Sequence, residues 1–408
     1  MKNLIFFDDA EREHLLPLTY SRPVSELRYG MLTIREKWEN DLGGKGSFIT
    51  QDYLSKKFPI EISNDNFVIN GSVLPNARLV KLIEQLSFNE ALLHKEELIA
   101  ARLNKQQFDN LMGNSPIEEL TGFELTTTPV IKIQRLPDLV SNQEKEFTLD
   151  FKRLTKGKTS QVLPKSVRAH FPDQIFVEKG AEIHQAVLNA ENGPIYISAN
   201  SSVMEGSFIR GPFYLGPSGV VKMGSCIYGP VSAGPHCKLG GELNNVTMIG
   251  YSNKTHHGFL GHSYLGEWCN VGAGTSNSNL KNTYSSVRLW NYPQGEALDT
   301  GLLFCGLFMA DHTKCGINTT FNTGTVVGFA SNLFGPIMHP RFIPSFSWGG
   351  GTEWVTHQLQ GAVRTAEAMM KRRGLELTEV DRTLFQSIFD ESKAYRIWES
   401  QAQHKDKE

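Results

Sequence analysis

From about residue 171 onward, single apolar residues recur every six positions. The longest unbroken series has these members: Ile197, Val203, Ile209, Leu215, Val221, Ile227, Ala233 and Leu239. A period of six fits neither an α-helix nor one alternating strand, but it is typical of a solenoid built from three short strands per coil. One inward apolar residue per side would then fill the narrow axis. The spacing therefore predicts a parallel β-helix over residues 171–345.

The series resumes twice after interruptions. Its later members are Phe259, Leu265 and Val271, and then Leu303, Met309, Cys315, Phe321, Val327 and Leu333. The step from Leu239 to Phe259 is 20 residues rather than 18, and the step from Val271 to Met309 is 38 rather than 36. Extra residues must leave the coil as loops, and loops on a rigid solenoid commonly carry function. We therefore expect the site near these two breaks.

The flanking regions have other patterns. Residues 1–170 predict a mixed α/β domain, with buried strands at Leu4–Phe7 and Phe67–Ile69, helices over 33–38, 78–86 and 94–103, and a linker over 141–158. Residues 346–408 predict helices. Thr352 is expected to cap one with Val355, Leu359, Val363, Ala366 and Met370 on its apolar face, and Thr378 with Asp381 to begin another. These helices either cover the open end of the solenoid or dock on a neighbouring subunit.

Composition narrows the class of protein. The chain has 41 basic and 43 acidic residues, a net charge of −2 and no long basic run, so we expect no nucleic-acid partner. No apolar stretch reaches the length of a membrane span. The apolar run before Asp8 and Asp9 is too short for a signal peptide. Five cysteines without a Cys-x-x-Cys spacing suit small core residues in the reduced cytoplasm.

Three of the 12 histidines, His256, His257 and His262, lie within seven residues at the first break. Transfer of an acyl group to an amine needs a base for the ammonium proton, and a neutral imidazole suits that task. The transfer also needs donors for the oxyanion, which a glycine-rich corner such as Gly272-Ala273-Gly274 can supply. Asn277 and Asn279 can orient sugar hydroxyls or the base. Alternatively, these histidines only hydrogen-bond the next coil.

This region resembles the acetyltransferase half of bacterial bifunctional UDP-N-acetylglucosamine diphosphorylase/glucosamine-1-phosphate N-acetyltransferases. The matching motifs are His256, Leu260-Gly261, Leu265-Gly266, Asn270-Val-Gly-Ala-Gly-Thr275 and Asn279. Counting back from Gly272 places the family's base on His256, whereas counting forward from Ile249-Gly250 places it on His257. The resemblance implies that His256 and Asn279 are catalytic, with His257, His262 and His312 as alternatives. It further implies a homotrimer that binds acetyl-CoA between neighbouring solenoids.

A second cluster, Asp311-His312-Thr313-Lys314, precedes the repeat position at Cys315. Lys314, together with Arg288 in the second break, has the charge to meet the phosphates of coenzyme A. Exposed charged corners are, however, also ordinary features of solenoids. Leu280, Lys281 and Asn282 depart from the family's motif after Asn279, which leaves the acceptor sugar open.

The N-terminal region is similar to sugar-phosphate nucleotidyltransferases over residues 16–34 and 66–74, and its Ser21–Arg28 opening resembles a reduced form of the bifunctional family. Val24 stands where the family has a phosphate-binding Lys, and Ser72 where it has a magnesium-binding Asp. Because nucleotidyl transfer from UTP, with release of pyrophosphate, depends on such charges, weak transfer or binding alone is expected. The resemblance places nucleotide binding on Arg22, Arg28, Asn70 and Gly71, with Lys37 and Asp9 as further substitutes and magnesium as an option.

The expected fold is thus an α/β nucleotidyltransferase-like domain over 1–170, a left-handed parallel β-helix over 171–345, and C-terminal helices over 346–408. The expected function is N-acetylation of an amino-sugar phosphate by acetyl-CoA, with a possible UDP-N-acetylglucosamine diphosphorylase activity. Two alternatives remain open: a single-activity acetyltransferase on another amino or nucleotide sugar, and a non-catalytic trimeric scaffold. The histidine-rich insertion favours an enzyme, because a scaffold has no need of it.

Overall fold

The computed structural model describes residues 1–112, 120–335, 337–351 and 353–400. These residues form two compact units. The first unit contains Met1–Leu15, Arg22–Leu27 and Leu32–Arg135, and the second contains Leu16–Ser21, Arg28–Met31 and the chain from Leu136 onward. The fold class expected from the sequence is confirmed: an α/β unit, a left-handed parallel β-helix and C-terminal helices.

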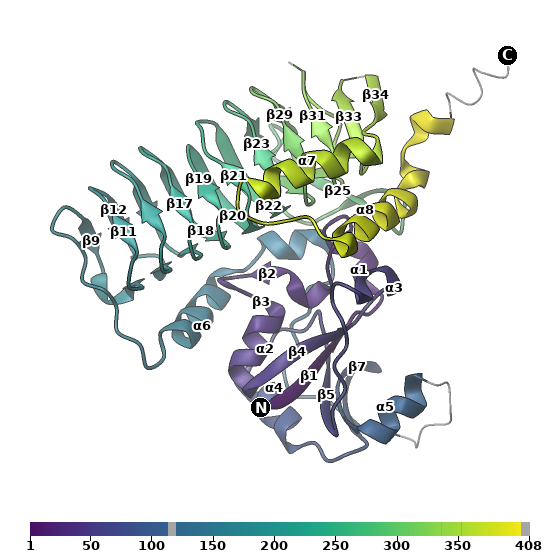
Figure 1. Cartoon of the computed structure of the whole chain (residues 1–408). Coiled ribbons are helices and arrows are strands. Elements are labelled where there is room, and N and C mark those ends of the chain that lie inside the picture. Colours follow the sequence, from purple (N-terminus) through teal and green to yellow (C-terminus); the bar gives the residue numbers. More distant parts are fainter. Residues whose placement is uncertain (113–119, 336, 352, 401–408) are drawn as a thin grey trace. The chain divides into compact units, whose positions relative to one another are not determined.

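The first unit is built on a six-stranded sheet with the strand order β4-β1-β5-β7-β6-β8. Strands β4, β1, β5 and β7 of this sheet are labelled in Figure 1. Its strands are β1 (Lys2–Phe7), β4 (Gly44–Ile49), β5 (Asp65–Asn70), β6 (Glu90–His94), β7 (Glu97–Asn104) and β8 (Thr121–Glu124). Strand β1 is parallel to β4 and β5, whereas β7 is antiparallel to β5 and β6. Parallel β1 and β5 therefore end at the same edge, where Asp9 and Asn70 lie.

Helices of the first unit include α1 (Glu11–His14), α2 (Ile34–Leu42), α3 (Asp52–Ser55), α4 (Ala77–Gln85) and α5 (Lys105–Met112). Helix α2 begins where the sequence predicts it, because Thr33 and Glu36 form a capping box, and it ends at Gly43 with φ 70°. The expected helix over 94–103 is wrong. Leu98 to Leu103 belong to β7, whose alternate residues pack on Ile5, Val68 and Phe108 in the core.

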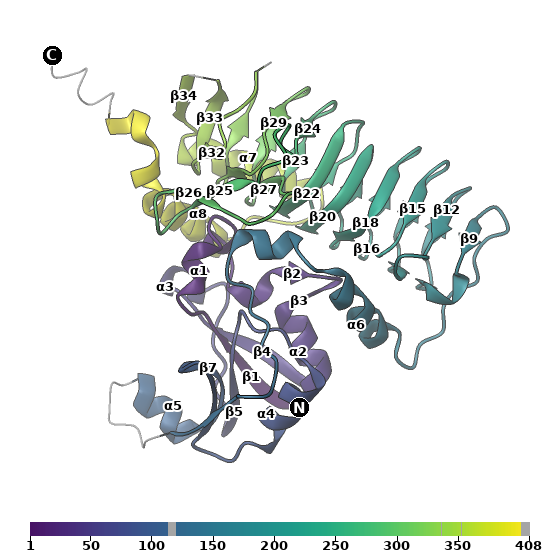
Figure 2. The same ribbon diagram turned by 180° about the vertical axis from the view of Figure 1, so that it is seen from behind.

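The second unit is a solenoid whose successive coils pair in parallel (Figures 1 and 2). One sheet of 12 strands contains β9 (Arg168–His170), β10 (Ile175–Val177), β12 (Val187–Asn189), β13 (Ile195–Ile197), β15 (Phe208–Arg210), β16 (Phe213–Leu215), β18 (Cys226–Ala233), β20 (Glu242–Gly250), β22 (Phe259–Glu267), β27 (Leu307–Met309), β30 (Thr325–Val327) and β32 (Phe342–Ile343). A shorter pair on another side contains β24 (Ser276–Asn277) and β29 (Thr320–Phe321).

A separate sheet of 10 strands forms a further side of the solenoid. Its strands are β11 (Glu182–Ile183), β14 (Ser202–Val203), β17 (Val220–Val221), β19 (Lys238–Leu239), β21 (Asn253–Lys254), β23 (Asn270–Val271), β28 (Lys314–Cys315), β31 (Asn332–Leu333), β33 (Ser347–Gly350) and β34 (Glu353–Thr356). Each two-residue strand places one side chain outward and the next inward. This alternation fixes which residues face the core.

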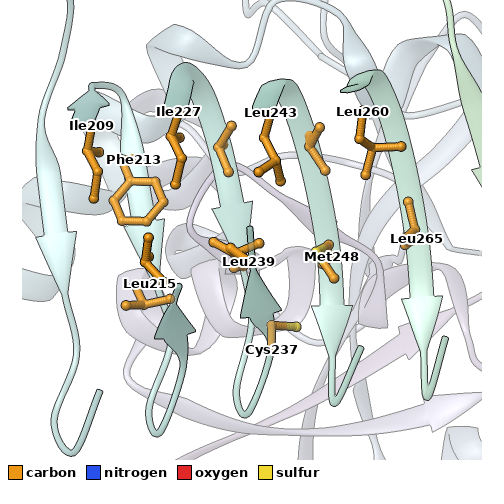
Figure 3. Packing of buried hydrophobic residues seen from close by; sticks show 14 of the residues in the cluster. Ile209, Phe213, Leu215, Ile227, Cys237, Leu239, Leu243, Met248, Leu260 and Leu265 are labelled. Atoms are coloured by element: carbon orange, nitrogen blue, oxygen red, sulfur yellow. The ribbon is translucent and has the colours of Figure 1, made fainter. Parts of the chain in front are cut away.

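The six-residue repeat describes the interior of the solenoid well. All eight residues from Ile197 to Leu239 are at most 2 % exposed, and they stack along the axis with their neighbours (Figure 3). Two expected members are wrong. Leu260 rather than Phe259 takes the inward position, and Leu303 is 41 % exposed. Both errors lie after the register breaks, where counting in steps of six residues no longer identifies the inward positions.

The two breaks differ in kind. Val221 pairs with Leu239, eighteen residues on, but Leu239 pairs with Lys254, only fifteen residues on. The first break is therefore a shortened coil and not the loop expected there. At the second break the chain leaves the solenoid after β24, forms an antiparallel hairpin of β25 (Arg288–Asn291) and β26 (Glu296–Asp299), and returns at β27. The expected insertion lies here.

Helices complete the second unit. Helix α6 (Glu144–Thr155) occupies the stretch expected to be a linker, and buried Phe147 anchors it against Phe176 and Tyr196 of the solenoid. Helices α7 (Leu359–Lys371) and α8 (Glu379–Glu391) follow β34, and α8 begins with the expected capping box of Thr378 and Asp381. Within the described ranges, no helix is long and apolar enough to cross a membrane.

The start of α7 differs from the expectation. Thr352 lies outside the described residues. Val355 belongs to β34, which pairs with β33, and it is 58 % exposed rather than part of a helical face. Helix α7 begins only after Gln358, and Val363, Ala366 and Met370 form the expected buried face.

Candidate active site

The histidine-bearing turn, residues 255–258, joins β21 to β22. Gly258 has φ 114°, and a Cβ there would lie 2.1 Å from the carbonyl oxygen of Thr275. Only glycine allows this close approach to the next coil. His256 and His257 are exposed, and a Cβ on Gly274 would lie 3.5 Å from Nε2 of His257. The structure therefore brings His257 to the glycine-rich corner, while His256 is its exposed neighbour.

The turn is held from inside the solenoid by Lys254. Its backbone pairs with Leu239 of the preceding coil, and its side chain takes the same inward position, where it is 1 % exposed. Nζ donates to the carbonyl oxygens of Gly240 at 3.1 Å, of His257 at 3.4 Å, and of His256. Burial lowers the pKa of Lys254 to about 8. The three ammonium hydrogens thus fix the backbone that carries both histidines.

The corner at residues 272–274 corrects the predicted oxyanion donors. The N–H of Gly272 donates to the carbonyl of Cys315 at 3.1 Å, and that of Gly274 donates to the carbonyl of His257 at 3.1 Å. Both groups are used in bonds between coils, so neither points to a reacting oxyanion. Ala273 contributes its carbonyl to the N–H of Asn318 at 2.7 Å. The corner supports the histidine-bearing turn, and two of its three predicted oxyanion donors, the N–H groups of Gly272 and Gly274, are engaged between coils.

Asn277 is also corrected. It lies at an inward position and is 4 % exposed. Its Oδ1 accepts from the N–H of Gly261 at 2.8 Å, and its Nδ2 donates to the carbonyl of Gly261 at 3.0 Å. Because both ends of the amide are bound to one residue of the neighbouring coil, Asn277 cannot orient sugar hydroxyls. The repeat register shows why: Asn277 follows Val271 by six residues.

His262 and Asn279 form a second polar group at the other end of residues 259–261. The amide nitrogen of Asn279 lies 2.9 Å from Nδ1 of His262, and the imidazole stacks on Phe304 with ring centroids 5.1 Å apart. Burial lowers the pKa of His262 to about 4, so the ring is neutral at pH 7. Asn279 therefore contacts His262, and the predicted catalytic pair of His256 and Asn279 is divided between two corners.

The second predicted cluster is spread over different surroundings. Asp311 accepts from the hydroxyl of Ser21 at 2.8 Å and from the N–H of Glu267 at 2.8 Å. His312 stacks on Trp268 with ring centroids 6.2 Å apart. These contacts favour a structural role for both residues.

The two cations expected to meet coenzyme A have different surroundings. Arg288 donates to the carbonyl of Ala297 across its own hairpin. Lys314 lines a pocket, donates from Nζ to the carbonyl of His312 at 2.7 Å, and has its pKa lowered to about 8 by burial. Lys238, Arg372 and Arg373 line the same pocket, although sequence reasoning missed them. Lys238 had a signal, since it precedes an inward repeat residue as Lys314 does; the arginines had none.

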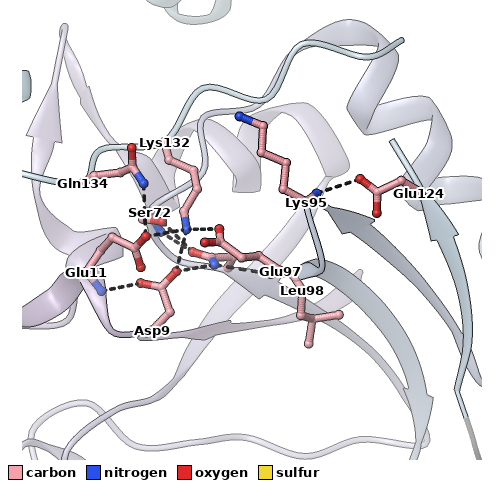
Figure 4. A network of polar contacts seen from close by, with 10 residues as sticks. Asp9, Glu11, Ser72, Lys95, Glu97, Leu98, Glu124, Lys132 and Gln134 are labelled. Atoms are coloured by element: carbon pink, nitrogen blue, oxygen red, sulfur yellow. Dashed lines mark hydrogen bonds and ion pairs between the residues drawn. The ribbon is translucent and has the colours of Figure 1, made fainter. Parts of the chain in front are cut away.

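In the first unit, a network of carboxylates surrounds Lys132 (Figure 4). Its Nζ lies 3.1 Å from Oδ2 of Asp9, 3.0 Å from Oε1 of Glu11 and 2.7 Å from Oε2 of Glu97. Asn70 donates to Asp9 at 2.6 Å. Burial raises the pKa of Asp9; at Glu11 burial is outweighed by hydrogen bonds with Asp9 and Lys132, which lower the pKa to about 2. The edge where β1 and β5 end is therefore already occupied by a cation.

This arrangement does not fit magnesium. Ser72, at the position of the family's metal-binding Asp, donates to Oδ1 of Asn70 at 2.7 Å and is 1 % exposed. The Lys132 ammonium pairs with the nearby carboxylates instead. Among the described residues, no group of three or more His, Cys, Asp or Glu side chains is arranged to hold a metal ion.

The predicted nucleotide-binding residues belong to both units: Arg22, Asn70 and Gly71 to the first and Arg28 to the second. Gly71 lies beside Ser25, and its N–H donates to the carbonyl of Phe7 at 2.8 Å. Arg22 is buried in the first unit. Arg28 is corrected: it belongs to the second unit, is 4 % exposed, lies over the Tyr214 ring at 5.6 Å and donates its backbone N–H to the Tyr264 hydroxyl. Packed in this way, the Arg28 side chain is buried within the second unit.

Comparisons with known proteins identify one family model and several solved structures. Residues 4–159 match a family model described as sugar nucleotidyl transferase, and no curated protein matches the sequence. Among solved structures, the polysialic-acid-specific acetyltransferase NeuO is similar at 10 % identity, over 50 % of this chain and 97 % of that one, with a TM-score of 0.28.

Two further acyltransferases are similar. The UDP-N-acetylglucosamine acyltransferase LpxA of Bacteroides fragilis matches at 14 % identity over 58 % of this chain and 84 % of its own, with a TM-score of 0.26. A mutant of the N-acyltransferase AntD of Bacillus cereus, in complex with dTDP and coenzyme A, matches at 11 % identity. The match covers 52 % of this chain and 100 % of the AntD chain, with a TM-score of 0.22.

Proposed function

We propose that the protein is a sugar-phosphate transferase whose β-helix acetylates the amino group of an amino-sugar phosphate, of glucosamine 1-phosphate type, with acetyl-CoA. The observation that carries this proposal is the exposed histidine-bearing turn. The buried Lys254 binds the backbone of this turn from inside the solenoid, and His257 lies against the next coil. Support for a sugar substrate comes from the sugar nucleotidyl transferase match of residues 4–159.

The chemistry needs one base at this turn. The amine attacks the thioester carbonyl, and an imidazole takes the proton that the amine loses. The tetrahedral intermediate then collapses, the C–S bond breaks, and the proton passes to the departing sulfur of coenzyme A. His256 is our first choice for the base and His257 the alternative. His262 suits the task less, because a base with a pKa of about 4 holds the proton poorly at pH 7.

The test is an assay of acetyl transfer from acetyl-CoA to glucosamine 1-phosphate. The quantity measured is the free thiol of the coenzyme A that is released. Replacing the base, His256→Ala, should lower the turnover number by roughly 10² to 10⁴-fold, the usual weight of general base catalysis. His184→Ala, which removes an exposed histidine from an earlier coil, is the matched control. Loss in His257→Ala with a silent His256→Ala would move the base by one residue. No effect of either would refute the mechanism.

We further propose that the active form is a homotrimer with acetyl-CoA bound between neighbouring solenoids. Support comes from the resemblance of the histidine-to-Gly-Ala-Gly-Thr motif alone. Sedimentation should report about three times the chain mass of 45.6 kDa. A stable monomer at micromolar concentration that remains active would contradict a site shared between subunits.

A single-activity acetyltransferase on another amino sugar or nucleotide sugar is the second candidate, and one observation favours it. Val24 is fully buried, Ser72 is bonded to Asn70, and Lys132 is held by three carboxylates. The first unit would then bind a sugar nucleotide without transferring it. Acetylation of a panel of amino sugars and nucleotide sugars, with UTP turnover measured in parallel, separates the two candidates.

A further inference from the structure

A pocket of about 520 Å³ lies between the outward face of the 10-stranded sheet and helix α7. Helix α7 passes across the strands of this sheet, as both views of the second unit show (Figures 1 and 2). The volume is that of an ordinary small-molecule site. The pocket includes Thr255, the residue directly before His256, so it adjoins the histidine-bearing turn.

The floor of the pocket is a ladder of four outward side chains on successive strands. Lys238 pairs with Asn253, Asn253 with Asn270, and Asn270 with Lys314. Neighbouring strands lie about 4.8 Å apart, so the two lysines stand at the ends of a row about 14 Å long. The opposite wall is the end of α7, where Nη2 of Arg373 donates to Oδ1 of Asn253 at 3.1 Å.

Among the described residues, those that line this pocket are cationic or neutral. Its lining contains Lys238, Lys314, Arg372 and Arg373 but no acidic residue. Burial lowers the pKa of Lys238, and the nearby cations Arg373, Lys222 and Arg372 lower it further. Gathering four cations costs free energy through desolvation and mutual repulsion. Such a cluster is stabilised when an anion with several charges occupies the space between them.

We propose that this pocket binds the diphosphate group of a small-molecule ligand. Guanidinium groups bind phosphate oxygens in pairs, and lysines contribute charge at the two ends of the ladder. The amide of Asn270, whose Oδ1 accepts from Nδ2 of Asn253 at 3.4 Å, supplies neutral donors between them. Two sources share this chemistry, coenzyme A and a nucleotide sugar. The choice of coenzyme A rests on the proposed function, whereas the diphosphate site itself does not.

The test is calorimetric titration of the full-length protein with inorganic pyrophosphate, with coenzyme A and with UDP-N-acetylglucosamine. The variants are Lys238→Met and Arg372→Ala, and the control is Arg364→Ala. Arg364 is an exposed arginine on the same helix that lines a different hollow. Pyrophosphate and at least one diphosphate ligand should bind, and each variant should weaken binding roughly tenfold or more. The control variant Arg364→Ala should bind the ligands as the wild type does. Added salt should weaken the binding of the ligands to the wild type.

The outcomes separate the pocket from the proposed function. If both variants weaken the binding of coenzyme A, this result supports the site and places the acetyl donor there. If both variants weaken the binding of UDP-N-acetylglucosamine but leave that of coenzyme A unchanged, this result supports the diphosphate site and assigns it to the sugar nucleotide. Acetyl transfer with unchanged affinity for all three ligands in both variants overturns the pocket and leaves the proposed function standing. Failure of all three ligands to bind overturns the pocket, and the acetyl-transfer assay then judges the function independently.

Discussion

Lys254 and Asn277 take interior positions that the six-residue repeat otherwise fills with apolar side chains. Each is bound to backbone at or next to a histidine: Lys254 to the carbonyls of His256 and His257, and Asn277 to the backbone of Gly261, directly before His262. A buried ammonium and a buried amide are costly in a core unless they are hydrogen-bonded. Their location on either side of residues 259–261 indicates that these bonds fix the geometry of two corners.

Lys254→Met is expected to lower acetyl transfer while leaving the fold intact. Methionine has a similar length and fills the interior position, but it leaves the carbonyls of Gly240, His256 and His257 without their donor. A turn displaced by about 1 Å typically costs up to 10²-fold in rate, so kcat should fall about 10 to 100-fold. Steady-state kinetics and a thermal melt on the same preparation measure both effects.

A matched control for this change is Leu239→Met, at the same interior position one coil earlier. It should leave kcat near the wild-type value, because no histidine carbonyl depends on Leu239. The pH profile gives a further readout. Because the pKa of Lys254 is about 8, wild-type activity should decline above that pH as the ammonium loses a donor, and Lys254→Met should lack this decline. Equal kcat in wild type and Lys254→Met would contradict the positioning role.

His262 is expected to make the second unit less stable in mild acid. Its pKa is about 4 in the folded protein and 6.5 in its ordinary state. Between these values the unfolded chain binds a proton that the folded chain does not, so stability is complete above pH 6.5 and is lost as the pH falls toward 4. The loss is at most about 1.4 kcal/mol per pH unit. Urea unfolding at pH 7, 6 and 5 measures it.

Comparison with His262→Gln isolates this contribution, because glutamine cannot titrate. The difference in unfolding free energy between wild type and variant should change with pH in the window from 6.5 to 4. A parallel pH dependence of the two proteins would show that His262 is not responsible. His184→Gln, in an exposed position, controls for the removal of a histidine as such.

At the scale of elements, the sequence predicts strands and helices best where one pattern repeats without interruption. The eight residues from Ile197 to Leu239 are all interior, because each coil of the solenoid repeats the same constraint. The helices expected near Thr33 and Thr378 are also confirmed, since the capping box that begins each of them is a local feature. Prediction from the local pattern failed where contacts with distant parts of the chain determine the secondary structure. Residues 98–103 form a central strand instead of a helix, and residues 144–155 form a helix anchored by Phe147 instead of a linker.

The candidate site was less predictable than the fold for a related reason. The histidine cluster and Lys314 are visible in the sequence, but the partners of each side chain depend on which coil lies next to it. Shortening of the coil between Leu239 and Lys254 turns a lysine inward, and six-residue counting from Leu239 does not reveal this. Arg372 and Arg373 reach the pocket only because α7 folds back on the sheet.

Helix α8 is expected to depend on Phe385. This side chain is 2 % exposed, and its ring centroid lies 4.8 Å from that of Phe329 and 4.9 Å from that of His312. Phe385→Ala should cost about 3 to 5 kcal/mol, the usual range for a buried phenylalanine. That cost is enough to undock the helix locally, so amide exchange over residues 379–391 should accelerate.

The control for this prediction is Leu375→Ala, which truncates a side chain that is 38 % exposed. It should leave exchange in α8 close to the wild-type rate. Unchanged exchange in Phe385→Ala would show that the aromatic contacts with the solenoid do not hold α8.

At the scale of the whole molecule, the chain passes between the two units more than once. Leu16–Ser21 and Arg28–Met31 belong to the second unit, although both lie within the region that matches the sugar nucleotidyl transferase model. Ser21 bonds to Asp311, and the N–H of Met31 donates to Asp150 at 2.9 Å. The nucleotidyltransferase-like opening is therefore partly used to stabilise the β-helix unit.

The first unit is expected to show little or no magnesium-dependent nucleotidyl transfer. A triphosphate brings about four negative charges, which related enzymes meet with a lysine and magnesium. Here Val24 stands in place of that lysine, and the single ammonium of Lys132 is already paired with Asp9, Glu11 and Glu97. Pyrophosphate release from UTP and a sugar 1-phosphate should stay below the ordinary turnover range of about 1 to 10³ s⁻¹.

The variant Lys132→Met tests the physical reason. Removing the ammonium, whose side chain is 7 % exposed, leaves three carboxylates facing one another, which should cost about 3 kcal/mol. Millimolar magnesium should then restore part of the lost thermal stability, because a divalent cation takes the place of the ammonium, while the wild-type melting temperature should not respond. Glu61→Gln, which removes an exposed carboxylate that pairs with Lys45, is the control and should melt as the wild type does. Rapid, magnesium-dependent pyrophosphate release by the wild type would refute the prediction and show that other residues bind the metal and the triphosphate.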